Sequence, residues 1–225
     1  VFGCVACIFE ALRGNKAYFI VPTSLLAEQV FQKMESFARN VTSKDIKIVS
    51  YYSGMKDKEA SLEKIKKGDF NILITTNRFL SANFDLLSKI NFSLIFIDDI
   101  GSFLKTSKNV DLILKLIGFS DELITSALNL INSKKGSLLK EREKLRETVL
   151  EVRSSGRVGK IIVSGATIRA KRTKRAKLFN FLLGFEESYV PTFVRNVEDI
   201  FVQPTEAIEE SALKLVKKLG SGGLV

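Results

Sequence analysis

The stretch that decides the fold is Ser93-Leu94-Ile95-Phe96-Ile97-Asp98-Asp99, an apolar run that stops on two adjacent acids. Continuous apolar residues without polar alternation predict a strand that is covered on both faces, as in a parallel sheet. Acids directly after such a strand lie where parallel α/β sheets bind ligands. Acids there also start turns and cap helices, so this stretch alone predicts the fold and leaves the role of Asp98 and Asp99 open.

Length and composition favour a globular chain with a polyanionic partner. The 225 residues are 45% hydrophobic, enough for one full core and part of a second. No apolar stretch reaches the roughly 18 residues of a membrane span, so we expect no membrane partner. The net charge of +10 makes nucleic acid the first partner to test.

The two cysteines, Cys4 and Cys7, have C-x-x-C spacing, but the chain has no other cysteine and no histidine. A zinc site needs further ligands, so zinc is excluded within this chain and is possible only outside it. The apolar residues 1–9 around them predict a buried helix instead. The absence of a disulfide framework predicts a reducing, cytoplasmic setting.

Short apolar strands alternate with helical segments along the chain, which predicts an α/β fold built from right-handed βαβ units. The expected strands are 17–21, 46–52, 71–75, 94–97 and 160–164. The expected helices are one capped by Ser24 that runs through Phe37, and others at 56–67, 77–87, 110–117, from 120 onward, and 138–152. The segment over about 120–157 is interpreted as a helical insertion. Its last helix, 138–152, carries opposite charges within one or two turns, so we expect it to be mostly solvated and able to protrude from the domain as an arm.

Small polar or acidic residues follow four of these strands and should meet at one edge of the sheet. The segments are Pro22-Thr23, Thr75-Thr76, Asp98-Asp99 and Ser164-Gly165-Ala166-Thr167. Each is weak evidence alone, because such residues are common in turns. In this order the set resembles motifs Ia, Ib, II and III of the first RecA-like domain of superfamily 2 helicases. The resemblance implies a three-layer domain with a mostly parallel central sheet.

The segments around and beyond the acids are similar to the helicase-like region of reverse gyrases over nearly the whole chain. The matching segments are 98–100, 103–111, 118–119, 166–169, 177–179, 182–185 and 194–196. Two positions depart from the family pattern. Gly101 stands where motif II usually ends in a further Asp, and Gly165 stands where motif III often has a second Ser.

This resemblance implies ATP hydrolysis with Mg²⁺, coupled to DNA strand separation and to positive supercoiling by a topoisomerase module in the same polypeptide or a partner. Asp98 would hold Mg²⁺ through water, and Asp99 would orient or deprotonate the attacking water. Ser164 and Thr167 would relay the nucleotide state. The residues expected to contact the DNA backbone are Pro22, Thr23, Thr75 and Thr76.

The densest positive run, 169–177, follows motif III directly. Its residues Arg172, Lys174 and Arg175 are candidate DNA contacts, and an ordinary solvated face is the alternative interpretation.

The chain contains no G-x-x-x-x-G-K-[ST] loop, which we expect just before Val1 of a larger protein. Residues 1–200 then form the first RecA-like domain, and 201–225, with an amphipathic helix beginning near 206, form a linker and the start of a second. Two alternatives remain open from the sequence. One is another superfamily 2 DNA or RNA helicase, and the other is a RecA-like module that binds nucleic acid without hydrolysing ATP.

Overall fold

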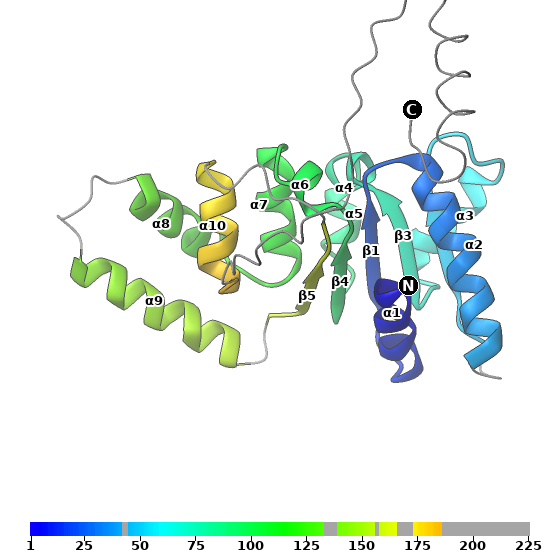
Figure 1. Ribbon diagram of the computed structural model, residues 1–225, viewed down its shortest axis with the longest axis horizontal. Helices are drawn as coiled ribbons and strands as arrows, with labels where there is room; N and C mark the ends of the chain where they lie inside the picture. The colour runs from blue at the N-terminus through cyan, green and yellow to red at the C-terminus, as the bar shows by residue number, and fades with distance from the viewer. Residues whose placement is uncertain (42–44, 133–138, 156–157, 166–172, 186–225) are drawn as a thin grey trace, which may run out of the picture. The chain divides into compact units, whose positions relative to one another are not determined.

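The computed structural model describes residues 1–41, 45–132, 139–155, 158–165 and 173–185. Within this part of the chain, five strands form one sheet in the order β2-β3-β1-β4-β5 (Figure 1). The strands are β1 (Ala17–Val21), β2 (Ile48–Tyr51), β3 (Ile72–Thr76), β4 (Leu94–Ile97) and β5 (Lys160–Val163). Every pairing is parallel, so the predicted α/β, RecA-like fold class is confirmed.

The register of the strands aligns their ends. Val21 of β1 pairs with Thr76 of β3, while Ile97 of β4 pairs with Ile20 on one side and Val163 on the other. The strands therefore finish nearly level, at what we call the carboxyl edge of the sheet. They begin together at the opposite side, the amino edge.

Both faces of the sheet are buried, which explains why β1 is apolar at every position. Tyr18 and Ile20 point into one hydrophobic core, whereas Ala17, Phe19 and Val21 point into the other. The helices α1 (Phe2–Leu12) and α2 (Ser24–Val41) cover the second core. Successive side chains of a strand alternate between faces, so a strand between two helical layers has no solvent-facing position to fill with a polar residue.

The other face carries the remaining helices that touch the sheet. They are α3 (Lys58–Lys67), α4 (Asn77–Ala82), α5 (Phe84–Leu87), α6 (Ile100–Phe103), α7 (Ser107–Leu116) and α10 (Lys174–Leu183). Beyond β5, α8 (Asp121–Asn132) packs on α10 and on α9 (Leu139–Ser154) (Figure 1). α8, at the start of the predicted insertion, packs into the domain, because it buries Leu123, Ile124 and Ala127.

The structure corrects several predicted helices. The helix expected over 77–87 is broken at Asn83, whose side-chain Nδ2 donates a hydrogen bond to the Phe79 carbonyl at 3.2 Å. Thr23, and not Ser24, caps α2, because its Oγ1 accepts a hydrogen bond from the Leu26 amide. The short helix α6 was not predicted, because its four residues are too few for a helical period.

The helix expected to be buried over 1–9 is buried on one face only. Cys4 and Cys7 are buried as predicted, whereas Phe2, Val5 and Phe9 are 72%, 55% and 57% exposed. Gly3 lets α1 approach the sheet, because a Cβ at this position would lie 2.6 Å from the Phe96 ring. The predicted helix near 206 and the boundary at 200/201 lie outside the described residues.

Candidate nucleotide and nucleic-acid site

The carboxyl edge collects the residues that the sequence singled out. Pro22 and Thr23 follow β1, Thr76 ends β3, Asp98 follows β4 and Ser164 follows β5. These strands are neighbours in the sheet order, so segments far apart in sequence lie side by side. Thr167 and Arg172, also predicted here, lie outside the residues that the structure describes.

Asp98 and Ser164 are in direct contact. The Ser164 hydroxyl donates a hydrogen bond to Asp98 Oδ1 at 2.5 Å. Backbone bonds fix both residues, because the Asp98 amide donates to the Ile20 carbonyl and the Ser164 amide donates to the Ile97 carbonyl, each at 2.9 Å. The Ile100 amide also donates to the Ser164 carbonyl at 2.8 Å. These bonds fix the position of the Asp98 carboxylate at the edge of the sheet. A movement of the segment after β5 would therefore displace this carboxylate through its hydrogen bond with Ser164.

A pocket of about 320 Å³ opens beside this pair. Its lining includes Gly3 at the first turn of α1, Lys33 of α2, Asp98 and Ser164. The N-terminus of a helix carries a partial positive charge and unpaired amide donors, and the Lys33 ammonium adds a full charge. An anion is favoured at the α1 end of the pocket, while the Asp98 carboxylate favours a cation.

The second acid has a different setting. Asp99 is exposed and has a left-handed backbone with φ 52°, the one positive φ of a non-glycine residue among the described residues. It is the N-cap of α6, where its side chain accepts a hydrogen bond from the Ser102 amide at 3.3 Å. The capping role that the sequence left open therefore applies to Asp99, whereas Asp98 lines the pocket.

The donor set at this pocket fits a hydrated hard cation. Magnesium commonly binds through one or two carboxylates and keeps several waters. Asp98 is a half-buried carboxylate that has one oxygen engaged by Ser164, and the described residues give its other oxygen no hydrogen bond. Those same residues contain no group of three His, Cys, Asp or Glu side chains that could form a closed metal cage.

The residues predicted to contact DNA divide into two groups. Pro22 and Thr76 are partly exposed and Thr23 is exposed, so all three reach the surface of the carboxyl edge. Thr75 does not, because it is 0% exposed and its hydroxyl is hydrogen-bonded to the Tyr18 hydroxyl at 2.7 Å. Thr75 is a core residue in this structure, and its side chain offers no surface to DNA.

The loop after β2 was not among the residues predicted from the sequence to lie at the carboxyl edge. Ser53 and Gly54 come one residue after this strand and line a pocket of about 760 Å³ together with Ser24 at the start of α2. Since β2 pairs with β3, this loop lies beside Thr76 at the carboxyl edge. A Ser-Gly pair directly after a predicted strand is the signal that could have identified it.

The described part of the basic run is more structural than predicted. Arg175 Nη1 lies 2.7 Å from Asp111 Oδ1 of α7, and both side chains are 27% exposed. Burial raises the pKa of Asp111, and the Arg175 guanidinium opposes that rise. Lys174 is exposed, and no described residue pairs with it. Of these two cations, Lys174 is therefore the one available to a nucleic acid.

Comparisons with known proteins agree with this geometry. The family model described as DEAD/DEAH box helicase matches residues 2–127. A reverse gyrase of Pyrobaculum aerophilum is 36% identical over 241 residues, and reverse gyrase 1 of Aquifex aeolicus is 41% identical over 228 residues. A reverse gyrase of Pyrococcus horikoshii is 39% identical over 243 residues. Each alignment covers the whole chain.

The chain spans only 20%, 19% and 15% of the length of these three relatives, respectively. No helix in the described ranges is long and apolar enough to cross a membrane. The matched model covers all the described elements from α1 to α7, including β1, β3 and the Asp98 strand β4. The chain therefore belongs to the DEAD/DEAH box helicase family and is similar over its full length to reverse gyrases.

Proposed function

We propose that this chain is the first RecA-like domain of a reverse-gyrase helicase module. In this proposal ATP binding and hydrolysis drive DNA strand separation, and a topoisomerase module of the same polypeptide or of a partner introduces positive supercoils. The observation that carries the proposal is the Asp98–Ser164 hydrogen bond beside the first turn of α1 and Lys33. The similarity to reverse gyrases supports this choice over an RNA helicase.

Each residue of the pocket has a proposed task. When bound, ATP would supply the phosphoryl bond that is hydrolysed. Mg²⁺ would neutralise the negative charge of its phosphates. Asp98 holds the water shell of the metal, and Ser164 fixes the orientation of its carboxylate. Asp99 orients the attacking water from the exposed position beside it. Thr167 continues the relay from Ser164 to the DNA side.

The carboxyl edge is also the proposed DNA surface. Pro22, Thr23 and Thr76 reach solvent there, and Lys174 of α10 is an exposed cation that pairs with no residue in the described ranges. Hydroxyls, backbone amides and lysines contact phosphates without reading base sequence. A helicase-like module that acts along DNA needs such contacts.

The first test replaces Asp98 with asparagine in the intact enzyme. We expect ATP turnover to fall by about 10²-fold or more, because the variant keeps the size of Asp98 but loses the charge that holds the metal. The control is Asp85→Asn, which removes the same charge from an exposed residue of α5 and should leave turnover unchanged. Equal turnover in the D98N and wild-type enzymes would refute the nucleotide site.

The second test uses the 225-residue chain alone. We expect it to bind DNA without hydrolysing ATP, because its sequence lacks a G-x-x-x-x-G-K-[ST] loop. Binding should weaken as salt rises, since phosphate contacts release counterions. Magnesium-dependent ATPase activity of this chain, or DNA binding that ignores salt, would contradict the proposal. Tighter binding to RNA than to DNA of the same sequence would favour the RNA-helicase alternative.

A further inference from the structure

The amino edge of the sheet, opposite the Asp98 pocket, forms a cleft of about 1100 Å³ that no step of the proposed mechanism uses. Five lysines line it, and none of its lining residues is acidic. They are Lys16, Lys66, Lys67, Lys89 and Lys160, which we call the amino-edge lysines.

The amino-edge lysines form a row because each one precedes or begins a strand. Lys66 and Lys67 end the helix that leads into β3, Lys16 precedes β1, Lys89 lies before β4, and Lys160 begins β5. These four strands are consecutive neighbours in the sheet. With strands about 4.8 Å apart, the row extends over about 14 Å.

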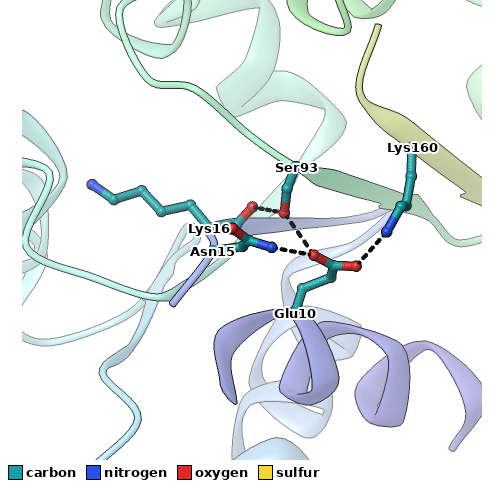
Figure 2. Close-up of polar contacts among 5 residues, drawn as sticks. All are labelled: Glu10, Asn15, Lys16, Ser93 and Lys160. Carbon is teal, nitrogen blue, oxygen red and sulfur yellow. Dashed lines mark hydrogen bonds and ion pairs between the residues drawn. The ribbon is translucent and has the colours of Figure 1, made fainter. Parts of the chain in front are cut away.

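Nearby acids neutralise only part of this row. The Lys160 ammonium pairs with the Glu10 carboxylate (Figure 2), at 2.9 Å from Oε1. Lys66 lies 3.1 Å from Glu63 Oε1. Lys16 donates a hydrogen bond to the Gly68 carbonyl at 2.6 Å and lies 5.0 Å above the Phe70 ring. It forms no ion pair with a described residue, although its charge helps to lower the pKa of Asp69, whose carboxylate is paired with Lys47.

Lys67 and Lys89 are exposed, and within the described residues neither ammonium forms an ion pair or a hydrogen bond. Lysines are common at helix C-termini, where they interact with unpaired carbonyls. That explanation accounts for Lys16 on the Gly68 carbonyl. It does not account for Lys67 and Lys89, because neither ammonium donates to a carbonyl of a described residue. Among the described residues, three lysines of the row, Lys16, Lys67 and Lys89, therefore form no ion pair.

We propose that the amino-edge lysines bind the phosphate backbone of a second DNA segment, independently of its sequence. This inference rests on the proposed function, which supplies DNA as the polyanion. A row of about 14 Å matches about four phosphates of one strand, at 3.4 Å of helix axis per nucleotide. Gly14 lines the same cleft, and a Cβ there would have no neighbour within 4 Å, so the rim leaves room for a bulky backbone.

The consequence is a domain that holds DNA at both edges of one sheet. The carboxyl edge contacts the segment that nucleotide turnover acts on, and the amino edge retains another segment by charge alone. Because lysines contact phosphates as point charges, the second contact adds affinity and salt dependence but no sequence preference.

The test replaces Lys67 and Lys89 with glutamine together in the 225-residue chain. The probe is a fluorescein-labelled DNA duplex of about 20 base pairs and mixed sequence, whose anisotropy is followed between about 50 and 200 mM salt. We expect the slope of log affinity against log salt to become shallower by about 1.8, from two lost contacts at about 0.9 each.

The matched control is the double variant Lys144→Gln with Arg146→Gln. It removes the same charge from exposed positions of α9, where acids such as Glu143 and Glu147 are interleaved. Its slope should stay within a few tenths of that of the wild-type chain. As a positional readout, DNA should protect Lys67 and Lys89 from acetylation while Lys144 continues to react.

The outcomes separate this inference from the proposed function. If the wild-type chain binds DNA and the K67Q/K89Q variant has the same affinity and slope, the amino-edge site is refuted and the proposed function stands. If the wild-type chain does not bind DNA, both are refuted. If the variant loses binding of an oligoglutamate peptide but keeps its DNA binding, the row is a dock for an acidic polypeptide and the inference is wrong.

Discussion

Replacing Glu10 with glutamine should measure how strongly one buried carboxylate joins α1 to the amino edge of the sheet. Glu10 is only 3% exposed, and three side chains donate hydrogen bonds to its carboxylate (Figure 2). Lys160 donates to Oε1 at 2.9 Å, whereas Asn15 and Ser93 donate to Oε2 at 2.7 and 3.1 Å. Burial of an anion is tolerated here because each carboxylate oxygen has a donor.

The structure sets the expected size of the effect. In the E10Q variant the new carbonyl oxygen can still accept from Lys160, and its amide group can donate to Asn15 and Ser93 if these rotate to become acceptors. The variant therefore loses the charge but keeps most of its hydrogen bonds. Hydrogen bonds to charged groups contribute about 1.5–3 kcal/mol and neutral ones about 1, so we expect a loss of about 1–2 kcal/mol at neutral pH.

The loss should depend on pH in one direction. The hydrogen bond from Lys160 is the main reason why the pKa of Glu10 lies below its ordinary value of 4.5. A carboxylate with a lowered pKa stabilises the fold fully above its ordinary pKa, and this contribution disappears as pH falls through the folded-state value. The difference between the wild-type and E10Q chains should therefore be largest at neutral pH and shrink below about pH 4.5.

Guanidinium unfolding of both chains, followed by circular dichroism at about pH 7 and about pH 3.5, measures this difference. The variant Lys160→Met tests the same bond from the other side. It should cost at least as much as E10Q at neutral pH, because it leaves the buried Glu10 carboxylate charged and with only Asn15 and Ser93 as donors. A difference between wild type and E10Q that is the same at both pH values, or that grows in acid, would refute the reasoning.

Two further predictions concern packing and charge. Arg175→Gln should destabilise the chain by about 1–2 kcal/mol at neutral pH, because it leaves the half-buried Asp111 carboxylate unpaired, whereas Lys174→Gln should stay within about 0.5 kcal/mol of wild type in the same denaturation assay. Equal effects would contradict this distinction. Gly3→Ala should destabilise by about 1–2 kcal/mol, because overpacking against the Phe96 ring costs about 1–3 kcal/mol and exceeds the gain of up to about 1 kcal/mol from better helix propensity. A more stable G3A chain would show that α1 can move outward freely.

Local patterns were sufficient for the fold class. The apolar run 94–97 predicted a strand buried on both faces, and β4 is buried at all its residues. The short strands that alternate with helices predicted a parallel sheet, which the pairings confirm. These features follow from the sequence because side-chain periodicity and strand length are properties of contiguous residues.

The ends of strands and helices were harder to predict, because they do not depend on the contiguous residues alone. The strand expected over 46–52 is confined to Ile48–Tyr51, since pairing with β3 and not composition decides where a strand ends. The helix over 77–87 divides at Asn83, where a local side-chain bond competes with the helical ladder.

The roles of individual polar residues required the tertiary structure. Two adjacent acids look alike in sequence, but the turn after β4 places Asp98 beside Ser164 and uses Asp99 to cap α6. Likewise, Thr75 is a core residue only because the register of β1 with β3 brings it close to Tyr18. The Asp98–Ser164 and Tyr18–Thr75 contacts join residues that are dozens of positions apart, so no local pattern contains them.

The sequence by itself determined that the chain forms a two-faced parallel sheet with helicase-like motifs at the strand ends. Only the tertiary structure decided which lysines stand together at the amino edge, because the order β3-β1-β4-β5 places Lys67 and Lys89 in one row. Strand order is fixed by crossovers that pack helices on both faces of the sheet. The free energy that selects this order comes from contacts between distant segments, and those contacts are present only in the folded chain.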